Sequence, residues 1–122
     1  MKCDPNKICI LVVDDDESIR EVMKMILESE LFTVNTAVDG ADALTQLAEC
    51  KVLPDLIISD MMMPHVTGWE LVDKLSKIDR YDRIPVIIHS GVAHYNQDNP
   101  MLSGCYFLRK PAEMNILFDL IK

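Results

Sequence analysis

Three aspartates stand directly after apolar segments of the chain, where their carboxylates could work together. Asp14 and Asp15 follow the apolar run 8–13, and Asp60 follows the run 56–59. If both runs are neighbouring strands of one sheet, these carboxylates converge on one edge, where their repulsion is costly unless something neutralises it. A hard divalent cation explains all three, because Mg2+ prefers a few carboxylates, backbone carbonyls and retained waters. We therefore predict a magnesium site at Asp14, Asp15 and Asp60.

An acidic residue at the end of a strand can also be an ordinary helix cap. Asp16 fits that role, because a carboxylate at a helix N-terminus accepts hydrogen bonds from free backbone N–H groups and favours the helix dipole. We expect Asp16 to cap the helix that follows it.

A hydroxyl and an ammonium group stand at the ends of two later strands. The fourth strand ends with Ser90, which is followed by Gly91, and the fifth ends with Lys110. A phosphoryl group needs such partners, since lysine supplies a point charge, serine a hydrogen bond, and glycine a close approach of the backbone. Together with a carboxylate nucleophile and a cation, these groups suggest chemistry through an aspartyl phosphate.

Alternating strands and helices are expected to position these groups. Several of the apolar runs are continuous rather than alternating, which is typical of parallel strands covered by helices on both faces. Five such units with right-handed crossovers predict a doubly wound α/β sheet, in which ligands bind outside the carboxyl ends of the strands. The expected strands are 8–13, 32–37, 56–59, 85–89 and 105–108.

The helices are predicted from their apolar spacing. The first has an apolar stripe and an outward polar face. The second follows the turn 39–40 and is marked by Leu44, Leu47 and Ala48. The third begins with the capping box 67–70 and is marked by Leu71, Val72 and Leu75. The fourth, within 91–103, should be short or irregular because of Pro100, and the last spans about 116–121. In the first helix the stripe is Ile19, Val22, Met23, Ile26 and Leu27, and the outward residues are Arg20, Glu21, Lys24 and Glu28.

Four motifs make the chain resemble the receiver domains of two-component response regulators, the CheY-like superfamily. They are the segment 10–16, Asp60-Met61-Met62-Met63-Pro64 with Gly68, the segment 87–90, and Lys110-Pro111. The motifs occur in the same order as in the family, and the resemblance covers essentially the whole chain. It implies a (βα)5 flavodoxin-like sheet with strand order 2-1-3-4-5. It also implies a single receiver domain over 1–122, with 1–6 as an N-terminal tail.

The resemblance also implies a role for each site residue. Asp60 would be the phosphoacceptor. Asp15 and Asp60 would bind Mg2+ directly, Asp14 mainly through water, and Met62 through its backbone carbonyl. Ser90 and Lys110 would contact the phosphoryl oxygens, with a cis peptide before Pro111 aiming the lysine. Phe107 matches the aromatic switch residue, which turns inward when Ser90 moves toward the phosphate.

In this family a sensor histidine kinase or a histidine phosphotransfer protein donates the phosphoryl group, and phosphorylation shifts a conformational equilibrium toward an output domain or target. Many members also form homodimers through the fourth helix, fifth strand and fifth helix. This chain departs from the family near that face, at Gly91, at Gly104 and in its short fourth-helix region. The family's output surface is therefore not carried over, and the chain could stand alone, act in a phosphorelay or belong to a larger protein.

Composition narrows the class of protein further. The chain has 122 residues, of which 49% are hydrophobic, and this suits one folded domain. Its net charge of −8 argues against binding to the backbone of a nucleic acid. No apolar run is long enough to span a bilayer, and the N-terminus lacks the apolar region of a secretion signal, so we expect a cytoplasmic protein. The cysteines form no C-x-x-C pair and are expected to be buried free thiols: Cys3, Cys9, Cys50 and Cys105.

Three other functions compete with this interpretation. A haloacid-dehalogenase-type Mg2+ phosphohydrolase would use Asp14 as nucleophile in an Asp-x-Asp pattern with Asp16. Ser90 and Lys110 would fill its later motifs. It needs a further acidic pair after the fourth strand, where 94–100 offers only Asp98, and usually a cap domain. A nucleotide- or flavin-binding module would need a glycine-rich loop after the first strand, and the sequence has none there. A degenerate receiver that only binds partners would not need the complete set of acidic, serine and lysine residues.

Overall fold

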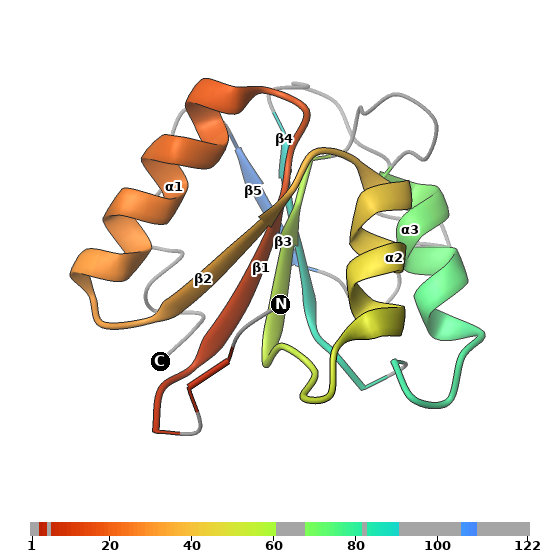
Figure 1. Ribbon diagram of the computed structural model, residues 1–122. Helices are drawn as coiled ribbons and strands as arrows, with labels where there is room; N and C mark the ends of the chain where they lie inside the picture. Colours follow the sequence, from red (N-terminus) through yellow and green to blue (C-terminus); the bar gives the residue numbers. More distant parts are fainter. Residues whose placement is uncertain (1–2, 5, 61–67, 82, 91–105, 110–122) are drawn as a thin grey trace.

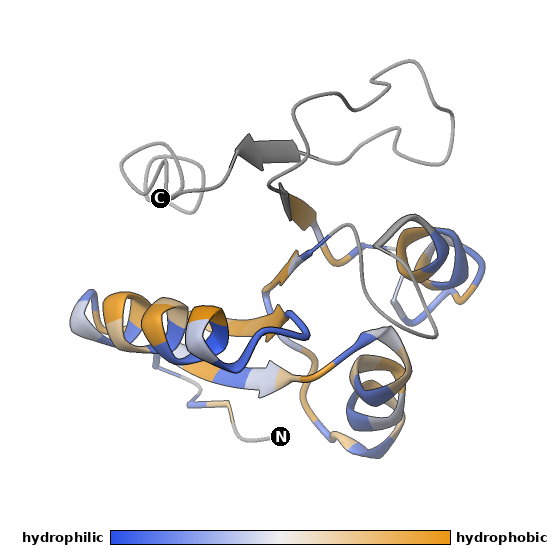
Figure 2. Cartoon of the chain, turned by 90° about the horizontal axis from the view of Figure 1, so that it is seen from above, coloured by the Kyte–Doolittle hydropathy of each residue, from blue (hydrophilic) through white to orange (hydrophobic). Residues whose placement is uncertain are grey.

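The computed structural model describes residues 3–4, 6–60, 68–81, 83–90 and 106–109. These residues form a parallel five-stranded sheet with the order β2-β1-β3-β4-β5, as expected. Helix α1 lies on one side of the strands, and α2 and α3 lie on the other (Figures 1 and 2). The elements are β1 (Cys9–Val13), α1 (Glu17–Ser29), β2 (Thr33–Ala37), α2 (Gly40–Glu49), β3 (Leu56–Ser59), α3 (Gly68–Ser76), β4 (Val86–Ser90) and β5 (Tyr106–Arg109).

The core has two layers, because side chains alternate between the two faces of each strand. On β1, Ile10 and Val12 pack in the cluster that contains Met23 and Leu27 of α1. Leu11 and Val13 pack in the cluster that contains α2 and α3. Since both faces are covered, all five residues of β1 are buried, which explains its continuous apolar run.

Helix α1 agrees with the prediction except at two residues. Asp16 caps it as expected, accepting hydrogen bonds from the backbone N–H groups of Ser18 and Ile19. Val22, predicted to lie in the apolar stripe, is 51% exposed. Arg20, predicted to point outward, is only partly exposed and bonds the backbone next to β1. The buried stripe is narrower than predicted: Met23 and Leu27 are its fully buried residues and pack in the cluster of Ile10 and Val12.

Helices α2 and α3 cover the opposite face. The Asp39 side chain caps α2 by accepting from the N–H of Asp42. Leu47 is buried as predicted, while Ala48 is exposed and Ala43 takes its place in the core. In α3 the predicted apolar residues Leu71, Val72 and Leu75 are all buried.

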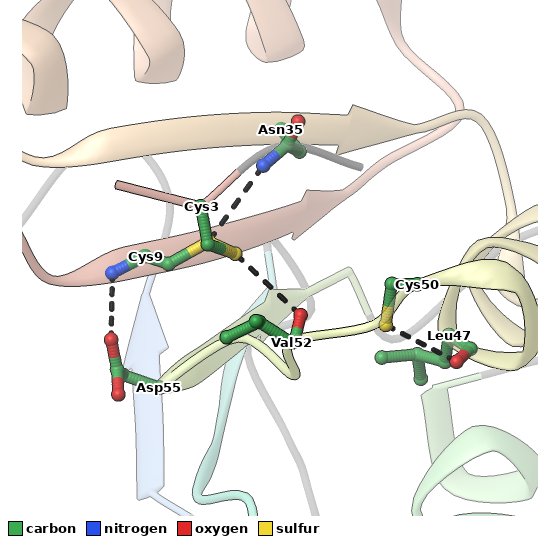
Figure 3. The surroundings of a disulfide bond; sticks show 7 residues. All are labelled: Cys3, Cys9, Asn35, Leu47, Cys50, Val52 and Asp55. Atoms are coloured by element: carbon green, nitrogen blue, oxygen red, sulfur yellow. Dashed lines mark hydrogen bonds between the residues drawn. A yellow bond between two sulfur atoms is a disulfide. The ribbon is translucent and has the colours of Figure 1, made fainter. Parts of the chain in front are cut away.

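The prediction of free thiols is wrong for two of the cysteines. Cys3 and Cys9 form a disulfide with a Cα–Cα distance of 5.4 Å (Figure 3). The intervening chain turns back, with the N–H of Lys7 donating to the carbonyl of Asp4 over 3.0 Å, and this turn carries Cys3 to the start of β1. Cys50 is a free buried thiol, as predicted.

Other predictions fall on residues outside the described ranges. These are the fourth and last helices, the cis peptide before Pro111, Cys105, and the differences from the family at Gly91 and Gly104. Among the helices that the structure does describe, none is both long and apolar enough to cross a membrane.

Candidate metal site

The pairing of β1 with β3 brings the two acidic segments together. Val13 is in register with Ser59, so the next residue on each strand, Asp14 and Asp60, lies at the same edge of the sheet. The N–H of Asp60 donates to the carbonyl of Val13 over 2.8 Å, which continues the ladder up to the aspartate itself. On the other side, the N–H of Asp14 donates to the carbonyl of Ala37 over 3.1 Å. Both backbones are therefore held by the sheet.

The three predicted carboxylates converge. One oxygen from each of Asp14, Asp15 and Asp60 lies within 4.8 Å of the other two. Asp14 is 2% exposed and Asp60 9% exposed, while Asp15 is open to solvent. At such a separation, two carboxylates repel each other by about 1 kcal/mol in a water-like dielectric, as for the exposed Asp15, and by roughly 3 kcal/mol at an effective dielectric constant of about 20. Oxygen donors crowded in this way suit a hard divalent cation.

Besides the sheet, contacts with two residues of the described part of the chain, Asp16 and Arg20, help to hold Asp14. The N–H of Asp16 donates to its Oδ1 over 2.9 Å, and Nη1 of Arg20 donates to its backbone carbonyl over 2.7 Å. Helical side chains lean toward the N-terminus, so an arginine in the first turn of α1 can reach back over the end of β1. Sequence reasoning missed this contact, although the position of Arg20 one turn beyond the cap was a usable signal.

Asp60 has a contact of its own that the sequence did not reveal. The hydroxyl of Ser59, a fully buried residue, donates to the backbone carbonyl of Asp60 over 2.9 Å. This bond helps to set the direction in which the chain leaves β3. A serine inside an apolar strand was a weak signal, because a buried hydroxyl must find a partner.

The remaining predicted residues belong to the same edge or lie outside the described ranges. β4 ends at Ser90, whose backbone is in register with Arg109 of β5. Phe107 pairs with Ile88, so it lies on β5 as expected. Because β3 pairs with β4 in parallel, Ser90 is at the carboxyl edge that also carries Asp60. Met62 and Lys110 lie outside the described ranges.

A comparison with protein families covers nearly all of the chain. Residues 10–122 match the family described as the response regulator receiver domain. The chain belongs to this family. A receiver domain is a signalling module rather than a conventional enzyme, so the family match decides against the haloacid-dehalogenase alternative.

Known proteins agree with this assignment. The receiver domain is 33% identical over 116 residues to the 3',5'-cyclic-nucleotide phosphodiesterase regA of Dictyostelium discoideum, covering 93% of this chain and 15% of that protein. The chain likewise spans only 54% of the second curated relative, a probable transcriptional regulator of Porphyra purpurea. It is therefore similar to one part of these longer proteins.

Solved structures share the fold of this receiver domain. Chemotaxis protein CheY4 of Vibrio cholerae superimposes with a TM-score of 0.82 at 27% identity, covering 94% of this chain and 96% of that one. Response regulator TrrA of Thermotoga maritima, solved in complex with Mg2+ and BeF, has a TM-score of 0.81 at 27% identity, with 93% and 95% coverage. The predicted flavodoxin-like topology is confirmed.

Proposed function

We propose that this receiver domain accepts a phosphoryl group on Asp60, with Mg2+ held by Asp14, Asp15, Asp60 and the backbone carbonyl of Met62. The observation that carries the proposal is the convergence of three carboxylates within 4.8 Å at the carboxyl ends of β1 and β3. Their mutual repulsion is relieved by a divalent cation. The relative from Thermotoga maritima, which was solved with Mg2+ and BeF, supports this choice of ion.

Asp60 suits the role of nucleophile better than Asp14. Strand β3 lies between β1 and β4, so Asp60 stands between the acidic pair and Ser90. Asp14 is almost fully buried, and its Oδ1 already accepts the N–H of Asp16. Bound Mg2+ would neutralise negative charge at the site when a carboxylate oxygen of Asp60 attacks phosphorus.

The other site residues complete the proposal. Ser90 and Lys110 would hold the phosphoryl oxygens through a hydroxyl hydrogen bond and an ammonium charge. Phe107, on β5 beside β4, would act as the switch residue that follows Ser90. Residues 1–122 would form one receiver domain, with 1–6 as its tail.

A receiver domain implies a histidine kinase as its partner, and a relative is the hybrid signal transduction histidine kinase D of Dictyostelium discoideum. We propose that a sensor histidine kinase or a histidine phosphotransfer protein is the donor here. Phosphorylation would shift the domain toward a conformation that acts on an output domain or a target protein, and a homodimer is one form that this output could take.

Labelling with a small phosphodonor tests the site directly. The purified chain is incubated with acetyl phosphate and Mg2+, and intact mass spectrometry should find one added phosphoryl group that hydroxylamine removes. Asp60→Asn should abolish the label, and chelation of Mg2+ should do the same. Asp79→Asn, which changes an exposed carboxylate on the turn after α3, should label normally. A label that persists in Asp60→Asn and is lost in Asp14→Asn would overturn the assignment of the nucleophile.

Metal binding is tested separately by stability. A ligand that binds only the folded state stabilises it by about 1.4 kcal/mol when present at tenfold its dissociation constant. Urea unfolding should therefore shift to higher denaturant as Mg2+ is added. Unfolding that is insensitive to millimolar Mg2+ would contradict the proposed site, whatever the outcome of the labelling.

A further inference from the structure

The disulfide between Cys3 and Cys9 lies at the opposite end of β1 from the acidic site. Cys9 is the first residue of β1 and is 1% exposed, while Cys3 is partly open to solvent. Cys3 is therefore the cysteine that is more open to an external thiol, and Cys9 is covered. This asymmetry decides which sulfur an external thiol can attack.

A polar group lies near each of the two sulfurs, as Figure 3 shows. The side-chain amide Nδ2 of Asn35, on β2, lies 3.7 Å from Sγ of Cys9 and can donate a hydrogen bond to it. Sγ of Cys3 lies 3.8 Å from the backbone carbonyl of Val52. A carbonyl oxygen can only accept, and a disulfide sulfur has no hydrogen to donate, so this second partner is one that suits the reduced thiol.

The surroundings of the bond thus contain a partner for each sulfur after reduction. The amide of Asn35 is placed to stabilise Cys9 as a thiolate, which is its form when it leaves the disulfide. The carbonyl of Val52 is placed to accept from the thiol of Cys3. From this arrangement we propose that Cys3 and Cys9 are a reversible redox site that exchanges with small-molecule thiols and disulfides.

The exchange balances in two steps. A thiolate of a small thiol attacks Sγ of Cys3, the more exposed cysteine, forming a mixed disulfide and breaking the Cys3–Cys9 bond. The electron pair leaves on Cys9, which takes up a proton. A second small thiol attacks the mixed disulfide, releasing Cys3 as a thiol and forming the small-molecule disulfide. Two molecules of the small thiol are oxidised as the protein disulfide is reduced, and the reverse sequence restores the bond.

The sheet does not depend on the sulfur bond. The N–H of Cys9 donates to Oδ2 of Asp55 over 2.8 Å, and the N–H of Asp55 donates to the carbonyl of Cys9 over 2.7 Å. These bonds hold the start of β1 beside the chain that enters β3 in either redox state. The N–H of Thr33 also donates to the carbonyl of Ile8 over 2.9 Å, so reduction frees Cys3 from Cys9 while leaving the sheet formed.

Cys50 provides an internal comparison. It is also buried, and its thiol donates to the carbonyl of Leu47 over 3.2 Å, but it is a free cysteine. It sits at the end of α2. A Cys50→Ser variant should therefore leave the redox behaviour of Cys3 and Cys9 unchanged.

Peptide mapping in glutathione buffers tests the proposal on the full chain. Trypsin cuts after Lys2, Lys7 and Arg20, so the disulfide would join the peptides 3–7 and 8–20. After equilibration of the folded protein and acid quenching, this linked peptide should accumulate as the buffer becomes more oxidised and disappear as it becomes more reduced. The Cys50→Ser protein should give the same curve, and Cys3→Ser should give no linked peptide.

Two results would overturn the proposal. Cys3 and Cys9 could be alkylated as free thiols at every ratio of oxidised to reduced glutathione, or the linked peptide could survive excess dithiothreitol in the folded protein.

A further measurement tests the role of Asn35. Loss of a typical hydrogen bond changes a rate by about two- to tenfold, so Asn35→Ala should slow reduction by dithiothreitol to that extent. An unchanged rate would remove Asn35 from the exchange mechanism and contradict its placement as the thiolate partner.

Discussion

The guanidinium of Arg20 donates to the backbone carbonyl of Asp14 over 2.7 Å, which joins the first turn of α1 to the end of β1. The contact places a permanent positive charge beside a cluster of three carboxylates. It also fixes the peptide that follows Asp14, from which Asp15 projects. Arg20 therefore supports the acidic site through the backbone and through charge, without contributing one of its three carboxylates.

Replacement of Arg20 should destabilise the metal-free protein. A hydrogen bond to a charged group contributes about 1.5 to 3 kcal/mol, and partial exposure reduces this, so Arg20→Gln should cost about 1 to 2 kcal/mol. Urea unfolding in the presence of a chelator measures the change. Lys24→Gln removes a positive charge from an exposed position of the same helix and is the matched control. Equal losses in the two variants would assign the effect to net charge alone.

Asp15→Asn should have opposite effects with and without metal. In a water-like dielectric, each neighbouring carboxylate at this distance opposes the charge of Asp15 by about 1 kcal/mol, so the variant should be more stable than the native protein when Mg2+ is chelated. If Asp15 binds Mg2+ as proposed, the order should reverse in Mg2+, because the variant lacks that ligand. Unfolding curves in the two buffers check both signs, with Asp79→Asn as the control. A variant that is less stable in both buffers would argue against repulsion in the acidic cluster.

Ser59→Ala should slow phosphorylation by more than its effect on folding explains. The buried hydroxyl of Ser59 bonds the carbonyl of Asp60, so its loss should cost about 1 kcal/mol of stability and loosen the backbone at Asp60. The rate of labelling by acetyl phosphate at saturating Mg2+ is the measurement, and Ser59→Cys, with a similar volume and a weak donor, is the comparison. If labelling rates match the native rate while stability falls, the serine has only a structural role.

Leu31→Gly should stabilise the protein. Leu31 follows α1 with φ of 69°, a left-handed conformation that glycine adopts without cost, and its side chain is 72% exposed. Relief of that cost outweighs the added flexibility of the unfolded chain, for a net gain of about 0.5 to 1 kcal/mol. Leu31→Ala keeps the Cβ and should gain nothing. Thermal unfolding of both variants distinguishes this backbone effect from loss of the exposed leucine, which would affect both alike.

The fold was predictable because its signals are local. Continuous apolar runs such as β1 reveal strands covered on both faces, and the spacing of Met23 and Leu27 reveals the buried side of α1. The acidic site was predictable for a related reason. Asp14 and Asp60 each follow directly after a strand, and parallel strands bring their carboxyl ends to one edge.

The errors arose where a side chain finds a partner that is distant in sequence or hidden by a turn. Helical periodicity predicts that Arg20 points into solvent, because periodicity does not show that its long side chain can reach the carbonyl of Asp14. The spacing of Cys3 and Cys9 does not reveal the turn between them, so the sequence predicts two separate thiols where the structure has a disulfide. Val22 and Ala48 are apolar but exposed, which apolar periodicity alone does not reveal.

The order of residues by itself determined the alternation of strands and helices and the acidic groups at the strand ends, because apolar periodicity and the direction of parallel strands follow directly from it. Only the tertiary structure decided which groups hold those carboxylates in place and which sulfurs meet. Hydrogen bonds and disulfides depend on distances of a few ångströms, and those distances are set by how separate segments pack together.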